Sequence, residues 1–226
     1  RYLLGNLNDK FDEVKLDEVK INQLPELEQL MLHKIYSLNQ SFNRYFSEYD
    51  FHNLYKELLS FCTVDLSAFY FDIRKDTLYC DSKSSEKRKS CITTLNIILE
   101  SLLKWFAPIL SFTTEEIFTL VDKKKSSIHL EKFIEIPKNY FNEELEEKWV
   151  QLKKIRDICN ISIEAKRANK VIGSSLEADL TINLDKKMID FTKGIDFSEL
   201  CITSVAKIKE NNSEEILVTT TKAEGK

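Results

Sequence analysis

The sequence predicts a mainly helical protein in which an antiparallel helical bundle is followed by a small α/β subdomain. Three observations support this fold class. Only four glycines and three prolines occur among 226 residues, which favours long helices over turn-rich sheets. Apolar residues recur with three-four spacing along several stretches, as the buried face of a helix requires. Residues 177–184 instead alternate between polar and apolar, as a half-buried strand does.

Changes in composition along the chain suggest four parts. The first residues are polar and charged, and a second change follows the lysine-rich run near residue 125. The expected parts are a connector over 1–21, the helical bundle over 22–125, a linker over 126–141, and a long helix with the α/β subdomain over 142–226. Because the chain starts at Arg1, we expect it to be a piece of a longer protein.

The first two helices of the bundle have clear start signals. Pro25 suits position N1 of a helix whose apolar stripe continues to Tyr45. Asp50 suits the N-cap of the next helix, and its stripe continues to Ile73. The second helix is therefore expected to be long and to end in the charged cluster that contains Asp72, Arg74, Lys75 and Asp76.

The later elements follow from caps and periodicity. A third helix is expected over 92–106 and ends before Pro108, and the spacing of Thr113 and Glu116 predicts a capping box for a short fourth helix. Asn142 is expected to cap the long helix, and Gly173 to adopt the left-handed conformation after its end. Beyond it we predict a strand over 177–184, a short helix over 186–193, and β segments over 200–206 and 214–220.

Composition and charge exclude several classes of function. The net charge of −4 and the pI of about 5.6 argue against a protein that coats nucleic acid nonspecifically, DNA included. No apolar run is long enough to cross a membrane, and no signal peptide occurs, so a soluble cytoplasmic protein is expected. The five cysteines are scattered, and neither they nor the three histidines have metal-ligand spacing. No set of residues forms an active site, so the chain is expected to bind rather than catalyse.

Three strings resemble one enzyme family. DLSAFYFDIRKDTLYCD at 65–81, WFAPILSFTTEEIF at 105–118 and KVIGSSLEA at 170–178 resemble, in order and spacing, the C-terminal region of isoleucyl-tRNA synthetases. The similarity covers nearly the whole chain. The APILSFTTEE pattern is shared by related class I synthetases, whereas the first and third strings are more specific to the isoleucine enzyme.

The resemblance implies a function in tRNA binding. In such enzymes a helical bundle packs against the anticodon stem-loop, so the implied partner is isoleucine tRNA and the fragment is expected to be a monomer. The family's catalytic, editing and zinc modules have no counterpart here, and the zinc cysteines would begin just past Lys226. No cofactor is therefore expected in this chain, although ATP and zinc are implied for the full-length enzyme.

The candidate tRNA contacts are cations placed where a phosphate backbone could reach them. They are Arg74, Lys75, Lys87, Arg88, Lys166, Arg167, Lys170 and the hydroxyl of Ser174. Each has a structural alternative. The cluster around Arg74 could form local ion pairs, the cations at 166–170 could balance the dipole of the helix, and Ser174 could be a cap. The two tryptophans, Trp105 and Trp149, are expected in cores rather than in contact with RNA bases.

Two other functions remain open at this stage. The first is a helical protein-interaction module whose basic stripes meet an acidic partner. The second is the equivalent domain of a valyl or leucyl enzyme, which would share the bundle.

Overall fold

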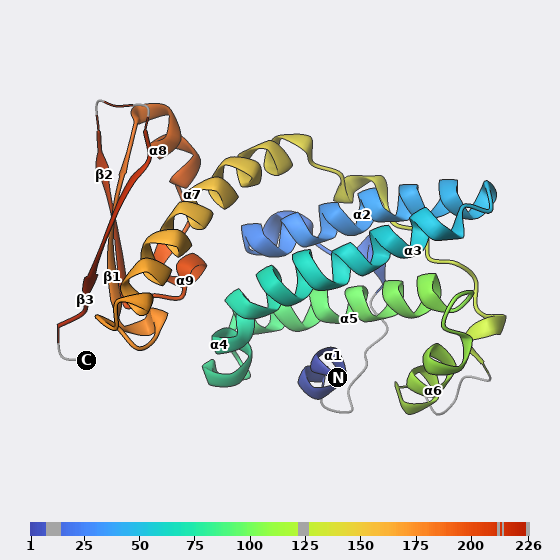
Figure 1. The fold of residues 1–226 in the computed structure, drawn as a ribbon. Helices are drawn as coiled ribbons and strands as arrows, with labels where there is room; N and C mark the ends of the chain where they lie inside the picture. The colour runs from blue at the N-terminus through green and yellow to red at the C-terminus, as the bar shows by residue number, and fades with distance from the viewer. Residues whose placement is uncertain (8–14, 122–126, 212, 214, 225–226) are drawn as a thin grey trace. The chain divides into compact units, whose positions relative to one another are not determined.

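The structure is a computed structural model, and it describes residues 1–7, 15–121, 127–211, 213 and 215–224 (Figure 1). The chain divides into two compact units, Arg1–Asn142 and Glu143–Lys226, which we name unit 1 and unit 2. Unit 1 is helical, and unit 2 combines helices with a three-stranded sheet. The predicted fold class is therefore confirmed.

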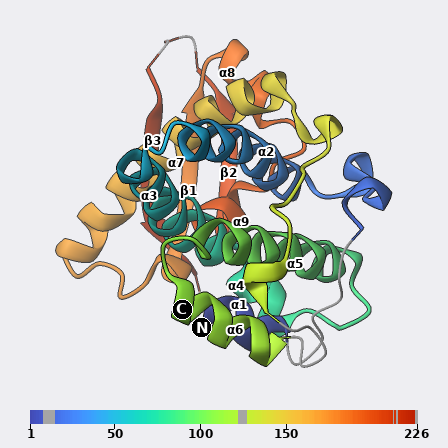
Figure 2. The ribbon, with the colours of Figure 1, turned by 90° about the vertical axis from the view of Figure 1, so that its right-hand side faces the viewer.

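Unit 1 is a bundle of helices. They are α1 (Tyr2–Leu7), α2 (Glu26–Ser47), α3 (Phe51–Ser60), a π-helix (Phe61–Phe71), α4 (Asp72–Cys80), α5 (Glu86–Phe106) and α6 (Ser111–Val121). Short 3₁₀ turns lie at Leu16–Glu18, Ile21–Gln23, Ile128–Leu130 and Lys138–Tyr140. Helices α2, α3 and α5 run side by side in both views (Figures 1 and 2), so their apolar stripes meet in one core.

The second predicted helix is a composite of three segments. Asp50 caps it as expected, because its carboxylate accepts a hydrogen bond from the backbone N–H of Asn53 at 3.2 Å. Helical backbone then continues from Phe51 to Cys80, but the middle segment is a π-helix. The periodicity of the sequence did not predict this change, because a wider helical turn still buries an apolar stripe.

Several helices start at other residues than predicted. Helix α5 begins at Glu86, ahead of the expected start, since the Ser85 hydroxyl accepts a hydrogen bond from the N–H of Arg88. Helix α6 already begins at Ser111, so Thr113 lies inside it and the predicted capping box is wrong. Pro25 occupies the N-cap of α2, one residue before the predicted N1 position.

The core of unit 1 is closed by aromatic residues. Trp105 is fully buried, as predicted, and its indole N–H donates to the Oδ1 atom of Asn39 at 3.1 Å. Its ring lies 6.2 Å from that of Phe42 between centroids. This hydrogen bond gives a buried polar pair in an otherwise apolar centre, which fixes the relative position of α2 and α5.

The described part of the segment predicted to be a linker, residues 127–141, packs against other residues of unit 1. The ring of Phe133 makes an edge contact with Phe42 at 5.0 Å between centroids. The hydroxyl of Tyr140 donates to the carbonyl of Leu16 at 3.0 Å, and Tyr140 itself is buried. The described part of this segment, from residue 127 onward, is therefore an integral part of the first compact unit.

Unit 2 consists of one long helix, a small sheet and two short helices. Its elements are α7 (Glu143–Ala168), a 3₁₀ turn (Ser175–Glu177), β1 (Ala178–Leu184), α8 (Lys186–Thr192), α9 (Phe197–Cys201), β2 (Val205–Glu210) and β3 (Leu217–Lys222). The strand order is β2-β1-β3, with β1 parallel to β2 and antiparallel to β3. The buried side chains of β1 pack beneath α7, whose Trp149 is in the core as predicted.

Most of the predicted elements of unit 2 are present. The strand and the short helix that follows it are confirmed, because β1 and α8 occupy the expected positions. The segment over 200–206 was expected to be β, but it contains the end of α9 and a turn in which Ile202 has φ 56°. Strand β2 therefore starts only at Val205, and β3 starts at Leu217.

Candidate nucleic-acid interface

The last turn of α7 places cationic side chains around a tight reversal of the chain. Lys170 has φ 57°, and its N–H donates to the carbonyl of Arg167 at 2.9 Å. The N–H of Val171 donates to the carbonyl of Lys166 at 3.0 Å. These two bonds form a Schellman motif in which Lys170 holds the left-handed position that usually favours glycine. The motif ends the helix and leaves Lys170 exposed.

Gly173 does not have the left-handed conformation that the sequence predicted, because Lys170 takes that position. Its N–H instead donates to the Oε2 atom of Glu177 at 3.1 Å. A Cβ atom at Gly173 would lie 3.0 Å from Oε1 of the same carboxylate. The close approach of the Glu177 carboxylate to this backbone therefore explains the glycine.

A surface pocket of about 420 Å³ lies beside this reversal. Three cations line it, namely Arg167, Lys170 and Lys222, together with the carboxylates of Glu164 and Glu177. Both carboxylates are committed, since Glu164 pairs with Arg167 at 2.6 Å and Glu177 accepts the N–H of Gly173. Lys170 and Lys222 make no ion pair with any residue that the structure describes. The pocket therefore favours an anion.

Lys222 is a site residue that the sequence did not reveal. It lies in β3 in register with Ala178 of β1, which brings it beside the end of α7. No local pattern predicts this pairing, because the two residues are joined only through the sheet. Of the predicted residues, Arg167 and Lys170 line the pocket. Lys166 and Ser174 are each adjacent in the chain to a lining residue but do not line the pocket themselves. The Ser174 hydroxyl does not act as a helix cap.

The predicted cations of unit 1 are more strongly engaged in the fold. Lys75 pairs with Asp72 at 3.0 Å on the surface of α4. Arg88 donates from its Nη1 atom to the carbonyl of Asp81 at 2.7 Å, which holds the turn before α5. Lys87, in the first turn of α5, is half-buried. The lysine run 123–125 lies outside the described residues.

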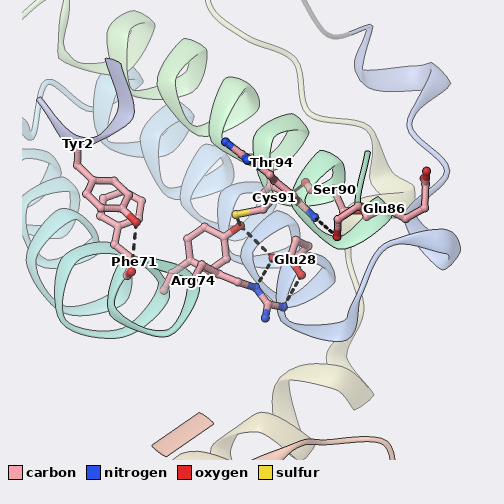
Figure 3. A network of polar contacts seen from close by, with 11 residues as sticks. Tyr2, Glu28, Phe71, Arg74, Glu86, Ser90, Cys91 and Thr94 are labelled. Carbon is pink, nitrogen blue, oxygen red and sulfur yellow. Dashed lines mark hydrogen bonds and ion pairs between the residues drawn. The ribbon is translucent and has the colours of Figure 1, made fainter. Parts of the chain in front are cut away.

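Arg74 is not exposed, and the structure gives it a role in the core (Figure 3). Its Nε and Nη2 atoms donate to the two carboxylate oxygens of Glu28 at 2.6 and 2.7 Å. The hydroxyl of Tyr70 donates to the same carboxylate at 3.1 Å, and lies 3.3 Å from the thiol of Cys91. Burial, together with the Glu28 charge, raises the pKa of Tyr70 well above its ordinary value.

This network corrects the prediction for Arg74. A side chain that is 3% exposed and held by a bidentate ion pair cannot also reach a phosphate at the surface. The alternative of a purely local cluster is also only partly correct, since Lys75 pairs locally with Asp72 but Arg74 pairs with a residue 46 positions away. Arg74 therefore joins α4 to the start of α2.

The thiol of Cys62 is expected to react slowly, because it is partly buried. Burial raises the pKa of the Cys62 thiol from its ordinary 9.0 to about 11. Only the thiolate is nucleophilic, so at about pH 8 we expect iodoacetamide to alkylate Cys62 roughly 100-fold more slowly than an unstructured cysteine peptide. The ratio of the two rates should shrink as the pH approaches 11, because the Cys62 thiolate then accumulates. Peptide mapping by mass spectrometry measures both rates, and equal rates at about pH 8 would contradict the burial of this thiol.

The described residues offer neither a metal-binding cluster nor a membrane-spanning helix. Within the described residues, no group of three or more histidine, cysteine, aspartate or glutamate side chains could hold a metal ion. Over the same residues, none of the helices combines the length and apolar character that crossing a bilayer requires.

Comparison with known proteins identifies the family. The family model of the anticodon-binding domain of tRNA ligases matches residues 28–182. The isoleucine–tRNA ligase of Pelagibacter ubique is 67% identical over 225 residues, which cover 100% of this chain and 25% of that protein. Those of Agrobacterium fabrum and Bartonella henselae are 40% and 39% identical, over 92% and 93% of this chain and 21% of each relative.

These matches agree with the resemblance seen in the sequence. The chain spans about a quarter or less of the length of the curated relatives it matches. The family model covers well over half of the chain and continues from the bundle of unit 1 into strand β1 of unit 2. On this evidence, the chain belongs to the family of anticodon-binding domains of tRNA ligases.

Proposed function

We propose that this chain binds the anticodon stem-loop of isoleucine tRNA and positions that tRNA for an isoleucine–tRNA ligase. Membership of the anticodon-binding family carries the proposal, and the isoleucine specificity rests on the relatives. The relatives do not favour a protein-interaction module or a valyl or leucyl domain. Binding of this kind would contribute to catalysis by holding the substrate in place, without any reacting group in this chain.

The pocket at the end of α7 is the part of unit 2 best suited to the phosphate backbone. Lys170 and Lys222 make no ion pair with a described residue, and Arg167 is held in place by its ion pair with Glu164. A phosphate group would replace the solvent of this pocket and release counterions from the RNA. Lys166 and the Ser174 hydroxyl lie next to the pocket residues in the chain, where they could contact a neighbouring phosphate.

In unit 1 we retain Lys75, Lys87 and Arg88 as secondary candidates and remove Arg74. Lys75 and its partner Asp72 are each about 41% exposed, so this ion pair is worth little and can open when a phosphate competes for the ammonium group. Arg88 keeps part of its guanidinium for the turn at Asp81, so its contribution should be smaller.

The full-length protein would use ATP to activate isoleucine and would transfer it to the tRNA. We place the ATP site and a zinc module outside this chain, and we expect the chain to act as a monomer in the cytoplasm. Its part in the reaction would be tRNA affinity and selection.

The test is fluorescence anisotropy with a labelled anticodon stem-loop of isoleucine tRNA. We expect saturable binding that weakens with salt, and weaker competition from a loop with a scrambled anticodon. In the triple variant Arg167→Gln, Lys170→Gln, Lys222→Gln, the loss of three phosphate contacts should lower affinity about 10- to 100-fold. It should also reduce the slope of log K against log salt by about 2.

A matched control removes the same charge elsewhere in unit 2. Lys186, Lys187 and Lys193 are exposed residues on or next to α8. Changing all three to glutamine should leave the affinity within about twofold of the parent chain, because they do not line the pocket. Equal competition by both loops would contradict anticodon recognition, and equal weakening by both triple variants would contradict the assignment of the pocket.

A further inference from the structure

Among the residues that the structure describes, the helices of unit 2 cover only one face of its sheet. Figure 1 shows α7 and α9 on one side of the sheet. The buried residues Leu180 and Ile182 lie on that side, because Ser162 of α7 contacts Thr220, the register partner of Leu180. In each strand, the residues that alternate with the helix-facing ones point to the opposite side of the sheet, because successive side chains of a strand lie on opposite faces. We name this side the open face and define it by its polar residues Asp179, Thr181, Asn183, Lys207, Lys209, Thr219 and Thr221.

The strand register brings these residues together. Thr181 of β1 pairs with Lys207 of β2 on one side and with Thr219 of β3 on the other. Asp179 is likewise flanked by Thr221 of β3. The open face therefore has two lysines along β2, and hydroxyl groups along β1 and β3. Large apolar side chains occur only at its corners, where Val205 and Leu217 are 39% and 49% exposed.

Most polar groups of the open face have no partner among the described residues, apart from the amide of Asn183, which donates to the carbonyl of Leu217 at 3.3 Å. Among the residues that the structure describes, the ammonium groups of Lys207 and Lys209 make no ion pair. The hydroxyls of Thr181, Thr219 and Thr221 have no hydrogen-bond partner over the same residues. The Oδ1 atom of Asp179 is buried and also lacks a donor. The exposed ammonium and hydroxyl donors of this surface, rather than the buried Asp179 oxygen, suit it to an anionic polar ligand.

The spacing of the lysines fits a chain of anions. Residues two apart on a strand lie roughly 6.6 Å apart on the same side, so Lys207 and Lys209 present two ammonium groups in a row along β2. Threonine hydroxyls of the open face can donate to phosphate oxygens between these lysines and along the neighbouring strands. A protein partner would instead require apolar or aromatic side chains at the centre of the face, where this sheet has threonine.

We propose that the open face binds a ribose–phosphate strand of the tRNA, as a contact surface separate from the pocket at the end of α7. This proposal rests on the proposed function, because it assumes that RNA is the partner. The two surfaces use opposite faces of the sheet, since Lys222 is in register with the buried Ala178 and not with an open-face residue. Unit 2 would thus contact more than one stretch of the RNA backbone.

The test compares two variants of the open face with a control in the same unit. Lys207→Gln with Lys209→Gln removes the two cations, whereas Thr181→Val with Thr219→Val removes hydroxyls without changing side-chain shape or favouring another fold. Lys186→Gln with Lys187→Gln is the charge-matched control on α8. The probe is a full-length transcript of isoleucine tRNA, and anisotropy gives its affinity at several salt concentrations. Circular dichroism confirms that each variant is folded.

The lysine variant should bind about 5- to 20-fold more weakly, with a salt slope lower by about 1.5, and the control should bind like the parent chain. The threonine variant should bind severalfold more weakly with an unchanged slope, because no charge is lost. Parent-like binding by both open-face variants would overturn this proposal, yet the proposed function would stand if the parent chain still prefers the correct anticodon loop. Self-association that is abolished by either variant would also overturn it, in favour of a second copy of the chain.

Discussion

Replacing Arg74 by alanine should lower the free energy of unfolding of unit 1 by about 3–5 kcal/mol. The change removes two hydrogen bonds from the carboxylate of Glu28, which is 0% exposed. Tyr70 remains as a donor at 3.1 Å, but a single neutral hydroxyl does not compensate a buried negative charge. The expected loss is a large part of the stability of a domain of this size.

Urea unfolding followed by tryptophan fluorescence measures this effect. The chain has two tryptophans, so a Trp149→Phe background leaves Trp105 as the reporter of unit 1. Lys75→Ala is the control, since the exposed pair with Asp72 should contribute less than about 1 kcal/mol. Replacing both partners, with Glu28→Met and Arg74→Leu, should recover most of the loss because no charge remains unpaired. A loss no larger than that of Lys75→Ala would contradict the buried ion pair.

Arg74 also shows why the sequence predicted part of this site incorrectly. A charged residue at the end of an amphipathic helix is usually solvated, and its neighbours Asp72 and Asp76 offered a local explanation. Its actual partner lies 46 positions away, so only the packing of α4 against the start of α2 reveals the pair. The sequence offers one indication of this pair: Glu28 is an acidic residue within the apolar stripe of α2, where a buried acid needs a partner.

The elements that were predicted correctly are those with strong local causes. The Asp50 cap, the end of α5 before Pro108 and the alternation of β1 each depend on residues within a few positions of one another. The left-handed residue after α7 was assigned to Gly173 on propensity, but the hydrogen bonds of the last turn select Lys170. Lys222 and the open face depend on strand register, which no local pattern in this sequence specifies.

Replacing Ile182 by alanine should produce the second large effect, a loss of about 2–5 kcal/mol from unit 2. Ile182 is fully buried at the centre of β1, in register with Ile208 of β2 and Val218 of β3. Its side chain therefore joins all three strands beneath the helices, and alanine would leave a cavity there. In a unit of this size the loss corresponds to a fall in Tm of roughly 10–30 °C.

Thermal unfolding in a Trp105→Phe background reports on this change through Trp149 of α7, which is 3% exposed. The matched control is Thr181→Ala, which lies one residue earlier in β1 and on the open face. This change removes no buried contact, so Tm should fall by a few degrees at most. Equal falls in Tm for the two variants would mean that both sides of β1 contribute equally to the stability of unit 2. That result would contradict a core on one side of the sheet only. Such a result would also weaken the open-face proposal, because that proposal needs Thr181 to be free for a ligand while Ile182 holds the sheet together.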